Sequence, residues 1–82
     1  MIVSLDTAPL RQNFRITHID WDQLSLEEGR RLREFGLATD VVIMPTHRGS
    51  LFSRDPMALT VGRMQIIIRA LQAAAIQVEP AA

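Results

Sequence analysis

The chain has 82 residues, and its nine basic residues, all of them arginine, balance nine acids, so the formal net charge is zero. A protein that binds nucleic acid or an anionic membrane usually has a positively charged surface, which this composition does not predict. The absence of cysteine excludes disulfides, thiolate zinc sites and a thiol nucleophile. No apolar run approaches the roughly 20 residues that span a bilayer, and the N-terminus has no signal-peptide pattern, so we expect one cytoplasmic domain over residues 1–82 without direct membrane insertion.

The first element predicted along the chain is a strand. Residues 1–13 are mixed in character and indicate only a turn or loop over residues 6–9. Residues 14–19 alternate between apolar and polar side chains, which is typical of a half-buried strand. The Asp-Trp-Asp sequence at residues 20–22 breaks the alternation, so the strand is expected to end there.

A short helix is predicted next, with a recognisable signal at each end. Ser25 and Glu28 have the spacing of a capping box, in which each side chain accepts a hydrogen bond from the backbone N–H of the other residue. Gly36 suits the left-handed conformation that ends a helix. Leu37 can then fold back on Leu32, which is the apolar contact of a Schellman motif.

The second half of the chain predicts short strands around turns. Residues 41–44 are an apolar run that indicates a buried strand, and Pro45 is expected to end it. Residues 46–56 are rich in turn-forming types and predict an exposed loop. Gly62 suits a type II′ turn between two strands, and residues 76–79 form the last strand. About five short strands with one inserted helix favour a small closed barrel, because closure removes exposed sheet edges.

This order of elements and several short motifs resemble the FeoA family. The motifs are Arg31-Leu32-Arg33-Glu34-Phe35-Gly36-Leu37, Asp55-Pro56, Val61, Ile66-Ile67-Ile68-Arg69, Ala73 and Ile76-Gln77-Val78-Glu79. The resemblance implies an SH3-like barrel that assists ferrous iron uptake by binding the cytoplasmic part of a membrane transporter, the part that carries a GTPase domain. The family's barrel also occurs at the C-terminus of iron-responsive repressors, so a metal-sensing or regulatory barrel is the alternative.

The residues that could carry chemistry suggest a metal site rather than an active site. Two histidines, no cysteine and serines outside any nucleophile motif give no catalytic spacing, so we expect no enzyme. His18, Asp20 and Asp22 would lie on one face of a strand at i, i+2 spacing and would suit a weakly bound divalent ion such as Fe²⁺ or Zn²⁺. The alternative is that His18 is a surface strand residue and the aspartates form a turn. No cofactor is expected to be required.

Partner binding has the best support from the residues. Leu51 and Phe52 are adjacent apolar residues in a polar stretch, and Arg48 and Arg54 flank them, which is the composition of an interface anchor. The alternative is that the two apolar side chains fold back and close the end of the barrel. Ile67 is expected to face away from its neighbours in its strand, toward a partner or a second copy of the chain.

Overall fold

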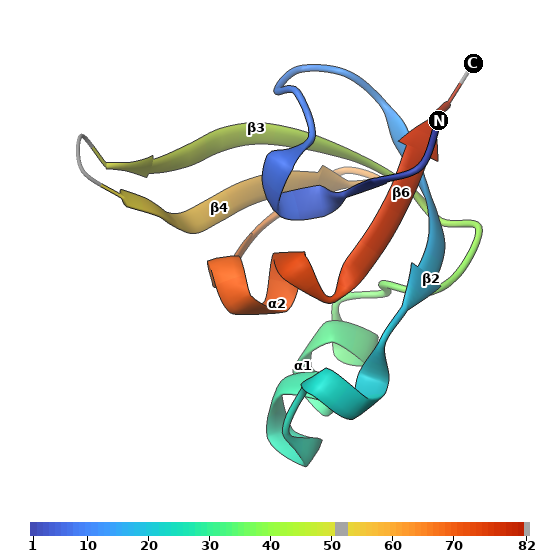
Figure 1. Cartoon of the computed structure of the whole chain (residues 1–82), viewed down its shortest axis with the longest axis vertical. Coiled ribbons are helices and arrows are strands. Elements are labelled where there is room, and N and C mark those ends of the chain that lie inside the picture. Colours follow the sequence, from blue (N-terminus) through green and yellow to red (C-terminus); the bar gives the residue numbers. More distant parts are fainter. Residues whose placement is uncertain (51–52, 82) are drawn as a thin grey trace.

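One curled antiparallel sheet with two α-helices makes up the molecule (Figure 1). The computed structural model describes residues 1–50 and 53–81. The elements in this part of the chain are β1 (Val3–Ser4), the 3-10 helix η1 (Leu5–Thr7), β2 (Phe14–Ile19), the 3-10 helix η2 (Trp21–Gln23), α1 (Leu26–Glu34), β3 (Val42–Ser50), β4 (Ser53–Val61), β5 (Met64–Ile68), α2 (Ala70–Ala74) and β6 (Ile76–Pro80). The mainly β architecture is the one that the sequence predicts.

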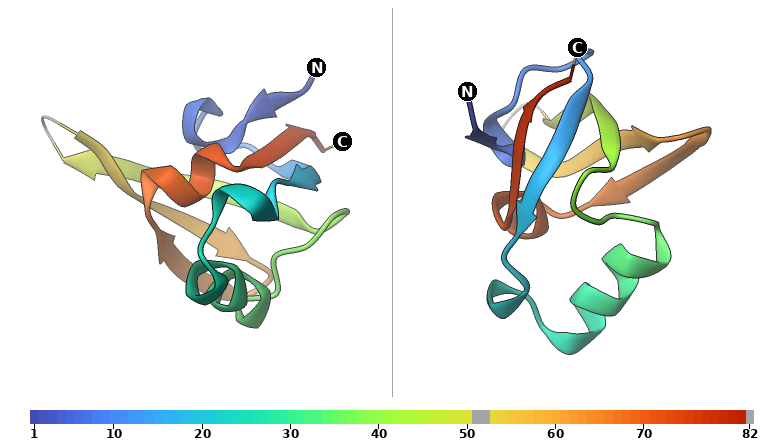
Figure 2. Two further views of the ribbon diagram at one scale, coloured as in Figure 1. Left: turned by 60° about the horizontal axis from the view of Figure 1, so that its bottom comes forward. Right: turned by 90° about the vertical axis from the view of Figure 1, so that its right-hand side faces the viewer.

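The strands pair in the order β1-β6-β2-β3-β4-β5, so β1 and β5 are the edges of the sheet. The sheet curls into a small barrel whose two edges are not joined to each other by hydrogen bonds in the described residues (Figure 2). The strand β1 lies beside β6, and α1 lies at the opposite end of the molecule from the N-terminus (Figures 1 and 2). No helix in the described residues is both long enough and apolar enough to cross a membrane.

The core fills the inside of the curled sheet, and β2 shows how the sequence reaches it. Phe14 and Ile16 are buried at alternate positions, as predicted. Two polar residues, Thr17 and His18, then separate Ile16 from Ile19. The pairing of β2 with β6 shifts register between Ile16 and His18, and this β-bulge returns Ile19 to the core.

Both ends of α1 have the predicted structure. The Ser25 backbone N–H donates to the Glu28 carboxylate at 2.8 Å, and the Glu28 backbone N–H donates to Ser25 Oγ at 3.1 Å. At the other end Gly36 has a φ of +86°. The Leu37 N–H donates to the Leu32 carbonyl at 3.1 Å, and both leucines are buried in the core. The capping box and the Schellman motif are therefore both confirmed.

The hairpin of β3 and β4 corrects the prediction for residues 46–56, which were expected to form a loop. The two strands extend well away from the rest of the molecule (Figure 1). Pro45 lies inside β3 and is buried, although it was expected to end the strand. Its carbonyl accepts a hydrogen bond from the Arg11 N–H at 2.7 Å, on the side away from β4. Because the N and O atoms of one strand residue point to the same side, Pro45 removes no hydrogen bond from the β3–β4 pairing.

Two further features of the strands differ in how well the sequence predicts them. Gly62 has a φ of +60° between the paired residues Val61 and Met64, as expected for the first central position of a two-residue turn. The strand β1 was not predicted, and it raises the number of described strands from about five to six. It consists of Val3 and Ser4, which pair with β6, and two residues are too few to show an alternating pattern.

Candidate interaction surface

The side of β3, β4 and β5 that points away from the core carries both apolar and polar side chains. The register places Pro45, Leu59 and Ile66 in one row, and all three are buried. Because successive strand residues point to opposite sides of a sheet, the neighbouring rows lie outside. We call these rows the outer face, which consists of Met44, His47, Ala58, Thr60, Gln65 and Ile67. Ile67 is 62% exposed, in agreement with its expected outward direction.

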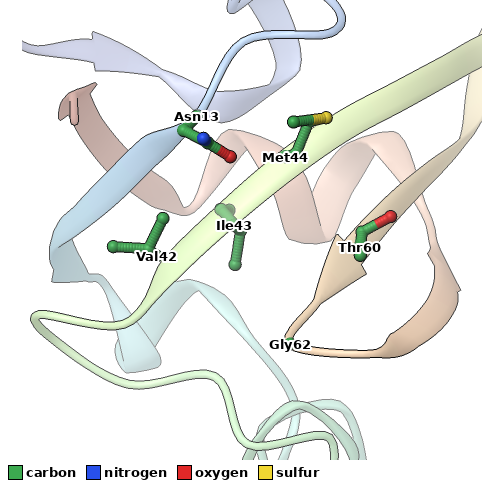
Figure 3. Close-up of a pocket in the computed structure, with 6 residues that line it drawn as sticks. All are labelled: Asn13, Val42, Ile43, Met44, Thr60 and Gly62. Atoms are coloured by element: carbon green, nitrogen blue, oxygen red, sulfur yellow. The ribbon is translucent and has the colours of Figure 1, made fainter. Parts of the chain in front are cut away.

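A hollow lies at the end of the outer face nearest the β4–β5 turn (Figure 3). Its volume is about 340 Å³, and the residues that line it are Asn13, Val42, Ile43, Met44, Thr60 and Gly62. Figure 3 shows Met44 on β3 and Thr60 on β4 beside Gly62 in the turn. This volume is near the lower limit for small-molecule sites, and its lining carries one hydroxyl, that of Thr60, beside the Asn13 amide. The hollow thus offers a shape for binding.

The strand β5 forms the edge of the sheet next to the outer face. Among the described strands its only neighbour in the sheet is β4, and no other described helix or strand makes extensive contact with it. Backbone N–H and C=O groups on its other side therefore lack a strand partner, which is the arrangement that invites another chain to add a strand. Met64 is 44% exposed and Ile67 is 62% exposed, so apolar side chains accompany this edge.

Asp55 connects β4 to α2 and gives the predicted Asp55-Pro56 motif a structural role. Its carboxylate accepts hydrogen bonds from the Ala70 backbone N–H at 2.7 Å and from Arg69 Nε at 3.1 Å. The Ala70 N–H, followed by the Arg69 guanidinium, holds the pKa of Asp55 below its usual range. The carboxylate thus satisfies an N–H group in the first turn of a helix that lies well beyond it in the sequence.

The charge around β5 is one-sided. Between Asp55 and Glu79 the chain carries two arginines, Arg63 and Arg69, and no acid. Arg69 forms an ion pair with Asp55 at 3.1 Å. Arg63, in the turn at the start of β5, has no ion-pair partner among the residues that the structure describes. The unbalanced positive charge therefore lies at the Arg63 end of the edge strand.

The predicted partner-binding residues separate into three groups. Leu51 and Phe52 lie outside the described residues, and Arg54 belongs to β4 but its side chain is outside the described part. The Arg48 guanidinium donates to the Ala8 carbonyl, and its Nε is buried with no hydrogen-bond partner among the described residues. This contact ties β3 to the segment that follows η1. Ile67 lies on the outer face, on the opposite side of β5 from the core.

The predicted metal ligands do not come together. The strand β2 ends at Ile19, and Asp20 has φ and ψ of −86° and 86°, outside the extended geometry that i, i+2 spacing requires. The Asp20 carboxylate accepts a hydrogen bond from Gln23 at 2.6 Å, and Asp22 lies in η2. Within residues 1–50 and 53–81, no group of three histidine or acidic side chains, including the one with His18, has an arrangement that could hold a metal ion.

Sequence reasoning missed the hollow and the sheet edge because neither is a local feature. The hollow joins Asn13, ahead of β2, to residues of β3 and of the β4–β5 turn. The edge depends on the strand order, which no short motif specifies. One available signal was the uncharged run from Met64 to Ile68 between two arginines in a region without acids.

Comparison with known proteins gives one family and several solved structures. The model of the FeoA domain matches residues 3–80. The fold is similar to iron(II) transport protein A from Clostridium thermocellum, with a TM-score of 0.81 and 23% identity over 95% of this chain and 45% of that one. A second similar structure is the zinc complex of FeoA from Stenotrophomonas maltophilia, described as a procaryotic SH3 domain protein. Its TM-score is 0.74, with 22% identity over 94% of this chain and 89% of that one. A manganese-dependent transcriptional repressor is also similar in fold, with a TM-score of 0.82 and 12% identity over 98% of this chain and 42% of that one.

These similarities establish the fold, and the predicted SH3-like barrel is confirmed. The chain spans less than half of the Clostridium thermocellum protein and of the repressor, so the other parts of those proteins have no counterpart in it. No curated protein matches the sequence.

Proposed function

The chain belongs to the FeoA family, which is linked to ferrous iron transport, and on this premise we propose that it is a non-catalytic accessory protein of ferrous iron uptake. Its partner is the cytoplasmic part of the membrane iron transporter, the part that carries a GTPase domain. The protein works in the cytoplasm and reaches the inner face of the membrane through this partner.

One observation carries the proposal beyond family membership: the sheet edge formed by β5 has a strand partner on one side only and carries exposed apolar side chains. Ile67 is 62% exposed and Met64 is 44% exposed on β5. Exposed apolar side chains beside an unpaired strand edge are a feature of protein interaction sites. The hollow beside Met44 and Thr60 adds a concave feature that a partner side chain could fill.

Co-purification of this chain with the transporter of the same organism tests the proposal. The experiment is carried out once with guanine nucleotide and once without it, and the parent protein is expected to bind the transporter. A variant with Leu51→Ser and Phe52→Ser tests the apolar pair that the sequence singles out. Loss of binding in the folded variant would assign the contact to that pair, and retained binding would assign it elsewhere on the molecule. Failure of the folded parent to bind under both nucleotide conditions would contradict the accessory role.

A metal-sensing or regulatory barrel is the second candidate function. It is supported by the similarity to the manganese-dependent repressor and by the Stenotrophomonas maltophilia FeoA, which was solved with zinc. The residues of this chain do not favour it, because His18 and the two nearby aspartates form no ligand group in the described part of the chain.

Thermal unfolding with added Fe²⁺ or Zn²⁺ separates the two functions. A ligand at about 100 times its Kd stabilises the folded state by about 2.7 kcal/mol, so a specific site would raise the Tm measurably. We expect the metal to cause no rise in the Tm of the parent that depends on His18. A rise that His18→Ala abolishes would support the sensing barrel over the interaction module.

A further inference from the structure

We propose that the unpaired edge of β5 binds an extended apolar segment of the partner as an added antiparallel strand, with an acidic residue of that segment placed against Arg63. The inference rests on the proposed function and deepens it, because it assigns the contact a place, a geometry and a chemistry.

The backbone of β5 is suited to strand addition. It is an edge strand, it is extended over Met64–Ile68, and β4 is the only described strand that pairs with it. An incoming strand there gains main-chain hydrogen bonds and also meets side chains at alternate positions. Ile67 is available on the outer face, while Ile66 and Ile68 face the core and keep the strand in place.

Edge strands that must stay unpaired are usually protected by a charge, a proline or a bulge. None of these protections occurs in β5, since Met64–Ile68 contains no charged residue and no proline and pairs with β4 in unbroken register. The opposite edge is different, because β1 has only two residues, Val3 and Ser4. The two edges therefore differ in the length that they offer, and β5 is the one that can hold a partner strand.

The charges give the partner segment its chemistry and its direction. At the C-terminal end of β5, Arg69 is already neutralised by Asp55 at 3.1 Å. At the N-terminal end, Arg63 has no ion-pair partner among the described residues. An acid in the partner thus gains most beside Arg63. Every strand pair in this sheet is antiparallel, and in an antiparallel addition the C-terminal end of the partner segment lies beside Arg63.

A second copy of the chain fits the edge less well than such a segment. Antiparallel pairing of two β5 strands about Ile66 would place Arg63 of each copy opposite Arg69 of the other. Arg63 of one copy would then lie opposite Arg69 of the other, which already pairs with Asp55, so neither copy would place an acid beside Arg63. The charge pattern favours a different protein that carries an apolar strand followed by Asp or Glu.

Synthetic peptides test the inference with the full chain. The probe is a capped peptide of alternating valine and threonine with glutamate at its last position, compared with peptides that carry glutamate at the first position or lysine at the last. Fluorescence anisotropy is expected to give the tightest binding for the peptide with the C-terminal glutamate, by about two- to fivefold, as for an exposed ion pair. Arg63→Glu is expected to reverse the preference toward the lysine peptide. Equal binding of all three peptides, or no binding, would overturn the assignment.

Two matched variants locate the site. Ile67→Lys places a charge on the edge strand at an exposed position, and Leu26→Lys makes the same change at a position on α1 that is 90% exposed. Peptide binding is expected to fall at least fivefold in the first variant and to stay unchanged in the second. Equal effects would place the peptide elsewhere. A concentration-dependent dimer of the parent that Ile67→Lys abolishes would overturn the inference in favour of a second copy.

The same variants distinguish this inference from the proposed function. If the parent and Ile67→Lys co-purify equally with the transporter, strand addition at β5 is wrong and the accessory role stands. If the peptide binds as expected but the transporter does not bind, the edge is assigned correctly and the accessory role is wrong.

Discussion

Asp55 is the residue that links the hairpin to the following helix. Its carboxylate accepts hydrogen bonds from the Ala70 N–H and from Arg69 Nε. Glu28 at the start of α1 and Glu79 on β6 are held in the same way, by Ser25 and by the ion-paired Arg15, respectively. In all three acids these contacts lower the pKa, so each stabilises the fold only while it is ionised.

Acid is therefore expected to destabilise the protein, and Asp55→Asn should change how it does so. A lowered pKa in the folded state adds stability above the unfolded pKa, near about 4, and that stability is lost as the pH falls through the folded value. At neutral pH Asp55→Asn should have a lower Tm than the parent, and the gap should close at pH values below about 4.

Thermal unfolding across a pH series measures this effect. Asp22→Asn is the control, since Asp22 is exposed and its carboxylate makes no hydrogen bond or ion pair in the described part of the chain. A gap between parent and Asp55→Asn that does not change with pH would contradict the assigned role of the carboxylate.

Residues whose roles follow from local geometry could be predicted from the sequence. Ser25 and Glu28 are three residues apart, and Gly36 lies just after the helix, so local capping rules are enough to predict their roles. The contact from Asp55 to Ala70 joins residues separated by a strand and a turn. The motif that contains Asp55 could be noticed in the sequence, but its role depends on how β4, β5 and α2 fold together.

Among the elements, α1 has one glycine inside it and a second glycine just after its end, and the two have different conformational roles. Gly29 lies in the helix, and an added Cβ would meet the Trp21 ring at 3.5 Å, which is an ordinary contact. The Arg33 guanidinium packs on that ring, with its carbon 4.1 Å from the centroid. Gly36 ends the helix at a φ of +86°, with nothing within 4 Å of an added Cβ.

The same substitution should thus have opposite effects at the two glycines. Gly29→Ala is expected to stabilise the protein by about 0.5–1 kcal/mol through helix propensity. Gly36→Ala is expected to destabilise it by about 1–2 kcal/mol, because alanine disfavours the left-handed conformation. Urea unfolding of the two variants measures both signs. A loss of stability in Gly29→Ala would mean that the helix packs against Trp21 more tightly than the 3.5 Å contact indicates.

The strands show where the sequence signal is incomplete. Pro45 and the turn-forming types of residues 46–56 oppose a strand by propensity. The structure accommodates Pro45 because its N atom faces away from β4, and the pairing shifts register after it. Only the pairing partner decides whether a proline in an extended run is harmless, and the partner of β3 is not visible in the sequence of β3 itself.

At the scale of the molecule, the predicted barrel is correct in class and incomplete at its edges. Alternation and turn residues indicate short strands, and a chain of 82 residues has little room for a second layer of helices. A closed barrel would have no sheet edges, whereas β1 and β5 each have a strand partner on one side only in the described structure. The exposed edge was not predictable because it depends on strand order, and it supplies the main new feature of the candidate interaction surface.

The most direct test of the accessory role is calorimetric titration of the full chain with the purified cytoplasmic part of the transporter, in the presence and absence of guanine nucleotide. Folding of each variant is first checked by its thermal unfolding. We expect saturable binding by the parent and by Leu26→Lys, and at least fivefold weaker binding by Ile67→Lys. Absence of binding by the folded parent under both nucleotide conditions would contradict the accessory role.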